Sequence, residues 1–81
     1  NCVGRWAMER IGPSAYRVKI GGRTVEVHLF EIGAFIVLED KTVIEYDGER
    51  IYIDGRPTQD SQVKALVEAA LEAVRTYPHG N

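Results

Sequence analysis

The chain has 81 residues, of which 44% are hydrophobic and 27% charged, and it carries a net charge of −2 and one cysteine. This composition excludes a disordered chain, and a single cysteine excludes an intramolecular disulfide. No apolar run reaches the roughly 18–20 residues of a membrane span and no secretory signal opens the chain, so we expect one soluble, cytoplasmic domain. A domain of this size buries only roughly 60–65% of its unfolded surface, so a partner subunit would add stability.

The charges are unevenly distributed along the chain. Residues 1–25 carry five basic side chains and one acidic, whereas residues 26–81 carry five basic and eleven acidic. Because a dominant nucleic-acid binder usually has a larger basic excess, this balance counts against that class. Seven arginines against three lysines, together with few Asn, Gln, Cys and Met, resemble the composition of a thermophile protein.

The first part of the chain is separated from the rest by Gly12-Pro13. We expect residues 1–12 to form an N-terminal arm or an extra edge strand. Residues 13–77 then make a single α+β domain, with a meander over residues 15–53 and a helix over residues 58–77. Residues 78–81 are a tail.

The first predicted hairpin turns at Gly21-Gly22, because glycine tolerates the positive φ of a two-residue type I′ turn. Apolar Val18 then faces Val25, while Arg17 faces Glu26. Apolar pairs therefore fall on one face of the sheet and an ion pair on the other.

A second two-residue turn is predicted at Asp47-Gly48. It sets Ile44 opposite Ile51 and Glu45 opposite Arg50, which repeats the division into an apolar and a charged face.

The two remaining turns complete a five-stranded antiparallel meander. Asp40-Lys41 is predicted to be a two-residue turn, and Ile32-Gly33-Ala34 a three-residue loop with a bulge. The resulting pairs are Leu29–Val37 and Phe30–Ile36 in one hairpin, and Val37–Ile44 and Leu38–Val43 in the other. The predicted strands are Ala15–Ile20, Arg23–Glu31, Phe35–Glu39, Thr42–Tyr46 and Glu49–Ile53.

After Asp54-Gly55-Arg56, interpreted as a strand-to-helix turn with Pro57 opening the helix, the apolar period changes from two to about 3.6. Thr58 or Asp60 is a candidate cap of this helix, and Pro78 ends it. Its apolar stripe is Val63, Leu66, Val67, Ala70, Leu71, Val74 and Tyr77. We expect it to cover the sheet face with Tyr16, Val18, Ile20, Val25, Val27, Leu29, Phe35, Val37, Ile44, Tyr46, Ile51 and Ile53.

The opposite sheet face is then left with an apolar patch ringed by charges, which is the composition of a binding surface. Its predicted members are Phe30, Ile36, Leu38, Val43 and Tyr52. We expect this patch to be an interface between copies of the chain. Two alternatives are that Trp6 and Met8 fold back over it, and that copies pair instead through helix residues Ala65, Ala69 and Ala73.

Single-stranded nucleic acid is the alternative ligand, because basic groups and aromatic rings both belong to the predicted outer face. The candidate residues are Arg17, Lys19, Arg23, His28, Phe30, Tyr52 and Trp6. Glu26 and Glu45 on the same face count against this ligand.

No catalytic, metal or phosphate motif stands out, so we expect a non-enzymatic binding or assembly module without a cofactor. His28 has Glu26 and Arg17 nearby but no Ser or Cys nucleophile. The possible metal ligands Cys2, His28 and His79 lie in three separate parts of the chain, so no metal site is predicted.

Overall fold

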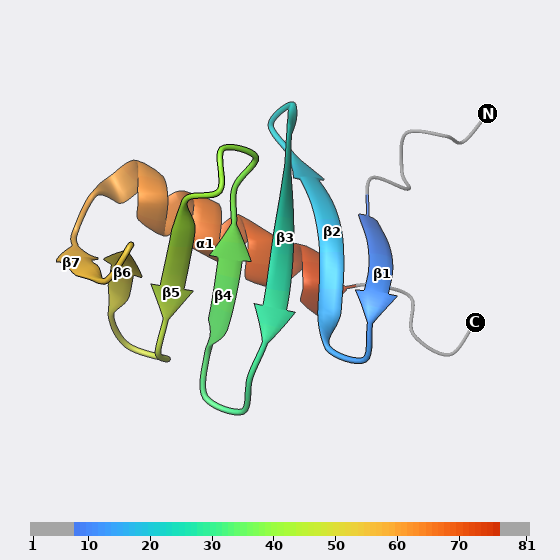
Figure 1. Ribbon diagram of the computed structural model, residues 1–81, viewed down its shortest axis with the longest axis horizontal. Helices are drawn as coiled ribbons and strands as arrows, with labels where there is room; N and C mark the ends of the chain where they lie inside the picture. The colour runs from blue at the N-terminus through green and yellow to red at the C-terminus, as the bar shows by residue number, and fades with distance from the viewer. Residues whose placement is uncertain (1–7, 77–81) are drawn as a thin grey trace.

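The computed structural model describes residues 8–76, and these form two layers, a seven-stranded antiparallel sheet and one helix (Figure 1). The strands lie side by side in chain order. The predicted α+β architecture, with an antiparallel meander and one C-terminal helix, is confirmed, but the predicted number of five strands is wrong. The elements are β1 (Met8–Gly12), β2 (Ala15–Ile20), β3 (Arg23–Leu29), β4 (Ala34–Val37), β5 (Val43–Tyr46), β6 (Ile51–Ile53), β7 (Arg56–Thr58) and α1 (Ser61–Arg75). Cys2, Trp6, Tyr77 and His79 lie outside the described residues.

The two strands beyond the predicted five lie at the edges of the sheet. β1 pairs with β2, so Met8–Gly12 form an edge strand, which was one of the two expectations for residues 1–12; residues 1–7 lie outside the described part of the chain. β7 pairs with β6 across Asp54 and Gly55, whose φ angles of 48° and 88° suit a type I′ hairpin turn. The strand-to-helix interpretation of this turn is therefore wrong, and the helix begins only after one more strand.

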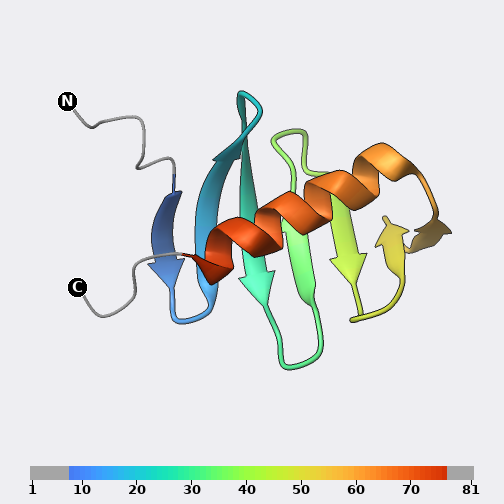
Figure 2. The same cartoon turned by 180° about the vertical axis from the view of Figure 1, so that it is seen from behind.

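Helix α1 crosses the sheet from the β7 side toward β1 (Figure 2). It begins at Ser61, because the Asp60 side chain caps it by accepting hydrogen bonds from the backbone N–H groups of Gln62 at 2.7 Å and Val63 at 3.2 Å. Its residues Val67, Ala70 and Val74 are buried against the sheet.

The core lies between this helix and one face of the sheet. The apolar side chains that are almost fully buried there are Tyr16, Val18, Val25, Val27, Ala34, Ile36, Ile44, Val67, Ala70 and Val74. β2 and β3 supply four of the ten, as the Gly21-Gly22 hairpin predicts, and the predicted pairs Val18–Val25 and Arg17–Glu26 are confirmed.

The register of β4 differs from the prediction and reverses its faces. Val27 pairs with Ile36 and Leu29 with Ala34, because the preceding loop is a four-residue turn closed by a hydrogen bond from Phe30 N–H to the Gly33 carbonyl at 2.8 Å. The change in pairing is an odd number of residues, so every side chain of β4 moves to the other face. Ile36 lies in the core, and the predicted inward positions of Phe35 and Val37 are wrong.

The next turn restores the predicted faces. It is a three-residue loop, Glu39 to Lys41, and Lys41 adopts a φ of 75°. Ile36 therefore pairs with Ile44 and Val37 with Val43, one residue from the predicted register. The register shift before β4 and the shift after it are both odd, so together they are even. The side chains of β5 therefore keep their predicted faces, and only those of β4 are reversed.

The last predicted hairpin is shifted by two residues, which leaves its faces unchanged. Ile44 pairs with Ile53 instead of Ile51, because the turn spans Asp47 to Arg50 instead of two residues.

A candidate interface on the outer face of the sheet

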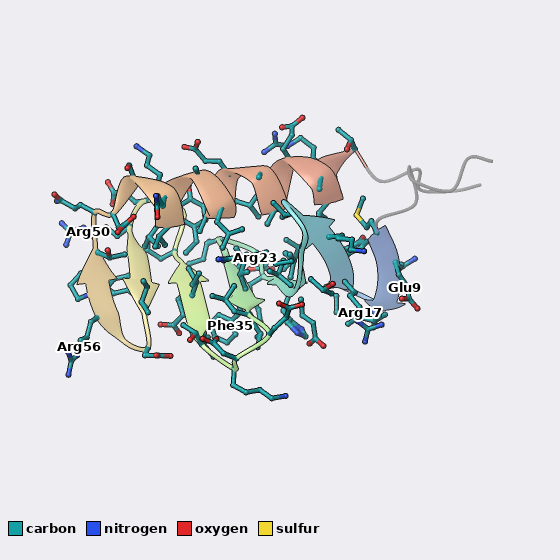
Figure 3. All side chains as sticks on the ribbon, turned by 90° about the horizontal axis from the view of Figure 1, so that it is seen from above. Glu9, Arg17, Arg23, Phe35, Arg50 and Arg56 are labelled. Atoms are coloured by element: carbon teal, nitrogen blue, oxygen red, sulfur yellow. The ribbon has the colours of Figure 1, made fainter. Side chains whose placement is uncertain are left out.

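The sheet face opposite α1, here called the outer face, is not covered by any described element. Figure 3 shows Arg17 and Phe35 on this side of the sheet, away from the helix. The strand register places five large apolar residues together on it, and we call them the outer patch: Phe30, Phe35, Val37, Val43 and Tyr52.

The outer patch agrees only in part with the predicted interface. Phe30, Val43 and Tyr52 belong to it as predicted. Ile36 is completely buried in the core and Leu38 packs against that core, so their predicted placement on the outer face is wrong. The reversed register of β4 is the cause, and it puts Phe35 and Val37 in their place.

Aromatic side chains of the outer patch line a shallow hollow. Phe30 and Phe35 meet edge to face with ring centroids 4.9 Å apart, and they retain 54% and 36% of their accessible surface. Together with Ile32, which is 74% exposed, and Tyr52, they line a hollow of about 350 Å³. Exposed apolar side chains gathered around one hollow are typical of interaction sites.

A chain of neighbouring polar side chains occupies the other half of the outer face, and we call it the charged ladder: Glu9, Arg17, Glu26 and His28. Arg17 Nη1 lies 3.1 Å from Glu9 Oε1, and Arg17 Nη2 lies 3.9 Å from Glu26 Oε2. Glu26 Oε1 lies 3.4 Å from His28 Nε2. All four side chains are partly exposed, so each pair contributes only about 0–1 kcal/mol to stability.

The charged ladder affects the nucleic-acid prediction. Arg17, one of the basic residues predicted to bind nucleic acid, lies between two carboxylates. Lys19 is exposed, and Trp6 lies outside the described residues. Arg23 lines the hollow on the helix side of the sheet, so its predicted placement on the outer face is wrong. Nucleic-acid binding by these residues stays a prediction, and a phosphate approaching Arg17 meets the negative charges of Glu9 and Glu26.

The structure locates some of the residues in the two alternatives to an outer-face interface. Met8 packs against the helix-side core, so its predicted fold back over the outer face is wrong. On α1, Ala65 and Ala69 are exposed and Ala73 packs partly against the core.

Aspartate carboxylates stabilise the two turns that flank β5. Asp47 Oδ1 accepts hydrogen bonds from the backbone N–H groups of Arg50 at 2.6 Å and Glu49 at 2.8 Å, and these bonds lower the pKa of Asp47. The hydroxyl and backbone N–H of Thr42 likewise lower the pKa of Asp40. Asp47 borders the aromatic hollow, so its turn supports the rim of the outer patch.

A second hollow, of about 550 Å³, lies on the helix side between the N-terminal half of α1 and the tips of two hairpins. Its apolar wall includes Ile20, Leu38 and Leu66, and its polar rim includes Arg23 and Asp60. These polar groups do not converge on one point in the way a catalytic or small-ligand site requires.

The described residues hold no group of three or more His, Cys, Asp and Glu side chains that could bind a metal ion. In residues 8–76, α1 is too short and too polar to cross a bilayer. No family model matches the chain, and neither a curated protein nor a solved structure matches it at a significant level.

Phe35 and Val37 are the outer-face residues that the sequence prediction missed. The signal available for them was the alternative four-residue turn Phe30–Gly33, which pairs apolar Val27 with Ile36 and Leu29 with Ala34. Gly33 supports that turn, because a Cβ there would lie 1.9 Å from the Tyr46 carbonyl oxygen.

Proposed function

We propose that this chain is a non-enzymatic assembly module that forms a homodimer through the outer face of its sheet. The observation that carries the proposal is the outer patch itself, with Phe30, Phe35 and the neighbouring Ile32 exposed around one hollow. One wet face is normal for an antiparallel sheet, but a wet face is usually polar. Covering these side chains in a dimer would remove their apolar surface from water, at about 25 cal/mol per Å².

The size of the face supports the same proposal. Seven strands about 4.8 Å apart, with the longest about 20 Å in length, make a face roughly 30 Å wide and 20 Å tall. This is of the same order as the ~800 Å² that each partner buries in a standard interface. Sheets that pack face to face in this way lie about 10 Å apart with interdigitating side chains.

The solution mass of the chain tests this function. We expect sedimentation or light scattering at low micromolar concentration to give twice the chain mass, and Tyr52→Asp to give a folded species of one chain mass. Gln62→Asp, at an exposed position of α1 on the other side of the sheet, is the matched control and should keep the dimer.

The same measurement with a mixed-sequence oligonucleotide at about 50 mM salt separates the second candidate. If the chain is a monomer that gains mass with the oligonucleotide, single-strand binding replaces dimerisation as the proposed function. A monomer that gains none would remove both functions.

A further inference from the structure

Five outer-face residues form one row that runs across the strands. Ala15 pairs with His28, His28 with Phe35, Phe35 with Glu45 and Glu45 with Tyr52. Phe35 is the centre of this row, because β4 is the middle strand of seven. His28 and Glu45 flank Phe35 on its two sides. Beyond them lie the small Ala15 and the large Tyr52.

When a second copy of this row faces the first in the opposite direction, each residue meets one of complementary size or charge. In a two-fold symmetric interface, if residue i contacts residue j, then j also contacts i. A two-fold axis that runs along β4, between two facing sheets, brings β3 over β5 and β2 over β6 of the second copy. His28 then faces Glu45 of the second copy twice, Tyr52 faces the small Ala15, and Phe35 meets its counterpart on the axis.

We infer that two copies of this chain pair about a two-fold axis along β4, with His28 of each copy hydrogen-bonded to Glu45 of the other. The inference rests on the proposed function and adds the arrangement of the dimer to it. Aligned packing of two twisted sheets, at about 30° between strand directions, inclines the axis by about 15° to β4.

Both groups of the cross-pair have unused hydrogen-bonding capacity. Glu45 is partly buried, and its carboxylate makes no hydrogen bond or ion pair with another described residue. His28 Nε2 lies 3.4 Å from Glu26, and within residues 8–76 the other ring nitrogen makes no hydrogen bond. The other ring nitrogen, Nδ1, is therefore available to donate a hydrogen bond to a carboxylate of a second copy where it carries a proton, in the Nδ1–H tautomer or in the imidazolium form.

Other placements of the axis bring two carboxylates together or leave a carboxylate unpaired. An axis along β5 sets Glu45 against itself. An axis along β3 sets His28 against itself and Glu45 against Gly12, so the carboxylate has no partner. An axis perpendicular to the strands and through the row sets both Glu45 and His28 against themselves. A last placement is an axis perpendicular to the strands that passes between this row and the next. It sets Glu45 against Val43, so the carboxylate is desolvated without a partner, which is costly.

A second row agrees with the axis along β4. It contains Arg17, Glu26, Val37 and Val43 as successive pair partners. Val37 is its residue on β4, so it meets its counterpart next to the two Phe35 rings. The two Val37 side chains and the two Phe35 rings then make the interface apolar along the axis. Glu26 lies over Val43 of the second copy and keeps its own partners Arg17 and His28, while Arg17 and Glu9 lie farther from the axis.

Charge reversal in mixed chains tests the cross-pair. Glu45→Lys alone places an ammonium group against His28 of the second copy, and His28→Glu alone places two carboxylates together, so each variant should raise the dimer dissociation constant by about 100-fold or more. In an equimolar mixture of the two variants each ammonium group can face a carboxylate, and we expect mixed dimers to form. Circular dichroism of each variant verifies its fold.

A cross-linking measurement on Val37, a β4 residue that meets its counterpart beside the axis, keeps the test independent of those substitutions. In a Cys2→Ser background, the Val37→Cys variant should be joined to its own counterpart by a short bismaleimide, whereas Lys19→Cys, two strands from the axis, should not. A wild-type monomer would overturn the proposed function and this inference together. A wild-type dimer whose mixed variants stay monomeric, or whose Val37→Cys variant is not cross-linked, would overturn this inference alone.

Discussion

Val37 and Leu38 are neighbours in the chain but lie on opposite faces of the sheet. Val37 pairs with Val43 on the outer face, whereas Leu38 packs against the core between sheet and helix. The strand has a side-chain period of two, so an aspartate at either position tests a different layer of the molecule.

Val37→Asp should give a folded monomer with a lowered melting temperature, because the charge is hydrated in the monomer but desolvated at the centre of the proposed dimer. Leu38→Asp should instead destabilise the fold by about 2–3 kcal/mol, because it places a charge against the core. Solution mass and urea unfolding of both variants separate these outcomes. If Val37→Asp unfolds the domain as much as Leu38→Asp, the outer face is internal core instead of interface.

Gly33→Ala should destabilise the domain by about 1–3 kcal/mol or more, because the new Cβ would lie 1.9 Å from the Tyr46 carbonyl oxygen and 2.9 Å from its carbon. Relief of this clash requires the backbones of β4 and β5 to separate beside the aromatic hollow. Gly12→Ala is the matched control, since its Cβ would meet only the Ala15 Cβ at 3.5 Å. Urea unfolding should show a clear loss for the first variant and little change for the second.

Asp60→Ala should lower the free energy of unfolding by about 1 kcal/mol, because the backbone N–H groups of Gln62 and Val63 lose their hydrogen-bond acceptor. Gln59→Ala, one residue earlier, does not touch the cap and serves as control. Thermal unfolding followed by circular dichroism measures both. Equal melting temperatures for the Asp60 variant and the wild type would show that the cap adds nothing.

Asp47 should make part of the stability dependent on pH. Its pKa is lowered in the fold by the N–H groups of Arg50 and Glu49, so the stabilisation is fully present above the unfolded pKa of about 3.8 and is lost as the pH falls through the lower folded value. The wild type should therefore melt at a higher temperature than Asp47→Ala at pH 7.

This difference in melting temperature should shrink as the pH falls below the unfolded pKa of about 3.8 toward the lower folded pKa. Glu49→Ala is the control, because only the backbone N–H of Glu49 takes part in the turn. A difference between wild type and Asp47→Ala that is constant with pH would assign the effect to the backbone of the turn instead of the carboxylate.

Local patterns in the sequence determined the class of the fold. The alternation of Val18 and Val25 with Arg17 and Glu26 around Gly21-Gly22 predicted the central hairpin, and the 3.6-residue period after Pro57 predicted the helix, although the helix begins at Ser61. These features depend on residues a few positions apart, so they are visible without tertiary contacts.

The register of β4, and with it half of the outer patch, was decided by tertiary structure. The loops on both sides of this short strand accept more than one length, and a difference of one residue moves Ile36 and Phe35 to opposite faces. Ile36 lies inside because it then packs with Val27 and Ile44 beneath the helix, while Gly33 allows the chain to pass against the Tyr46 carbonyl. Such contacts join residues that only the folded chain brings together, so sequence periodicity alone leaves both registers open.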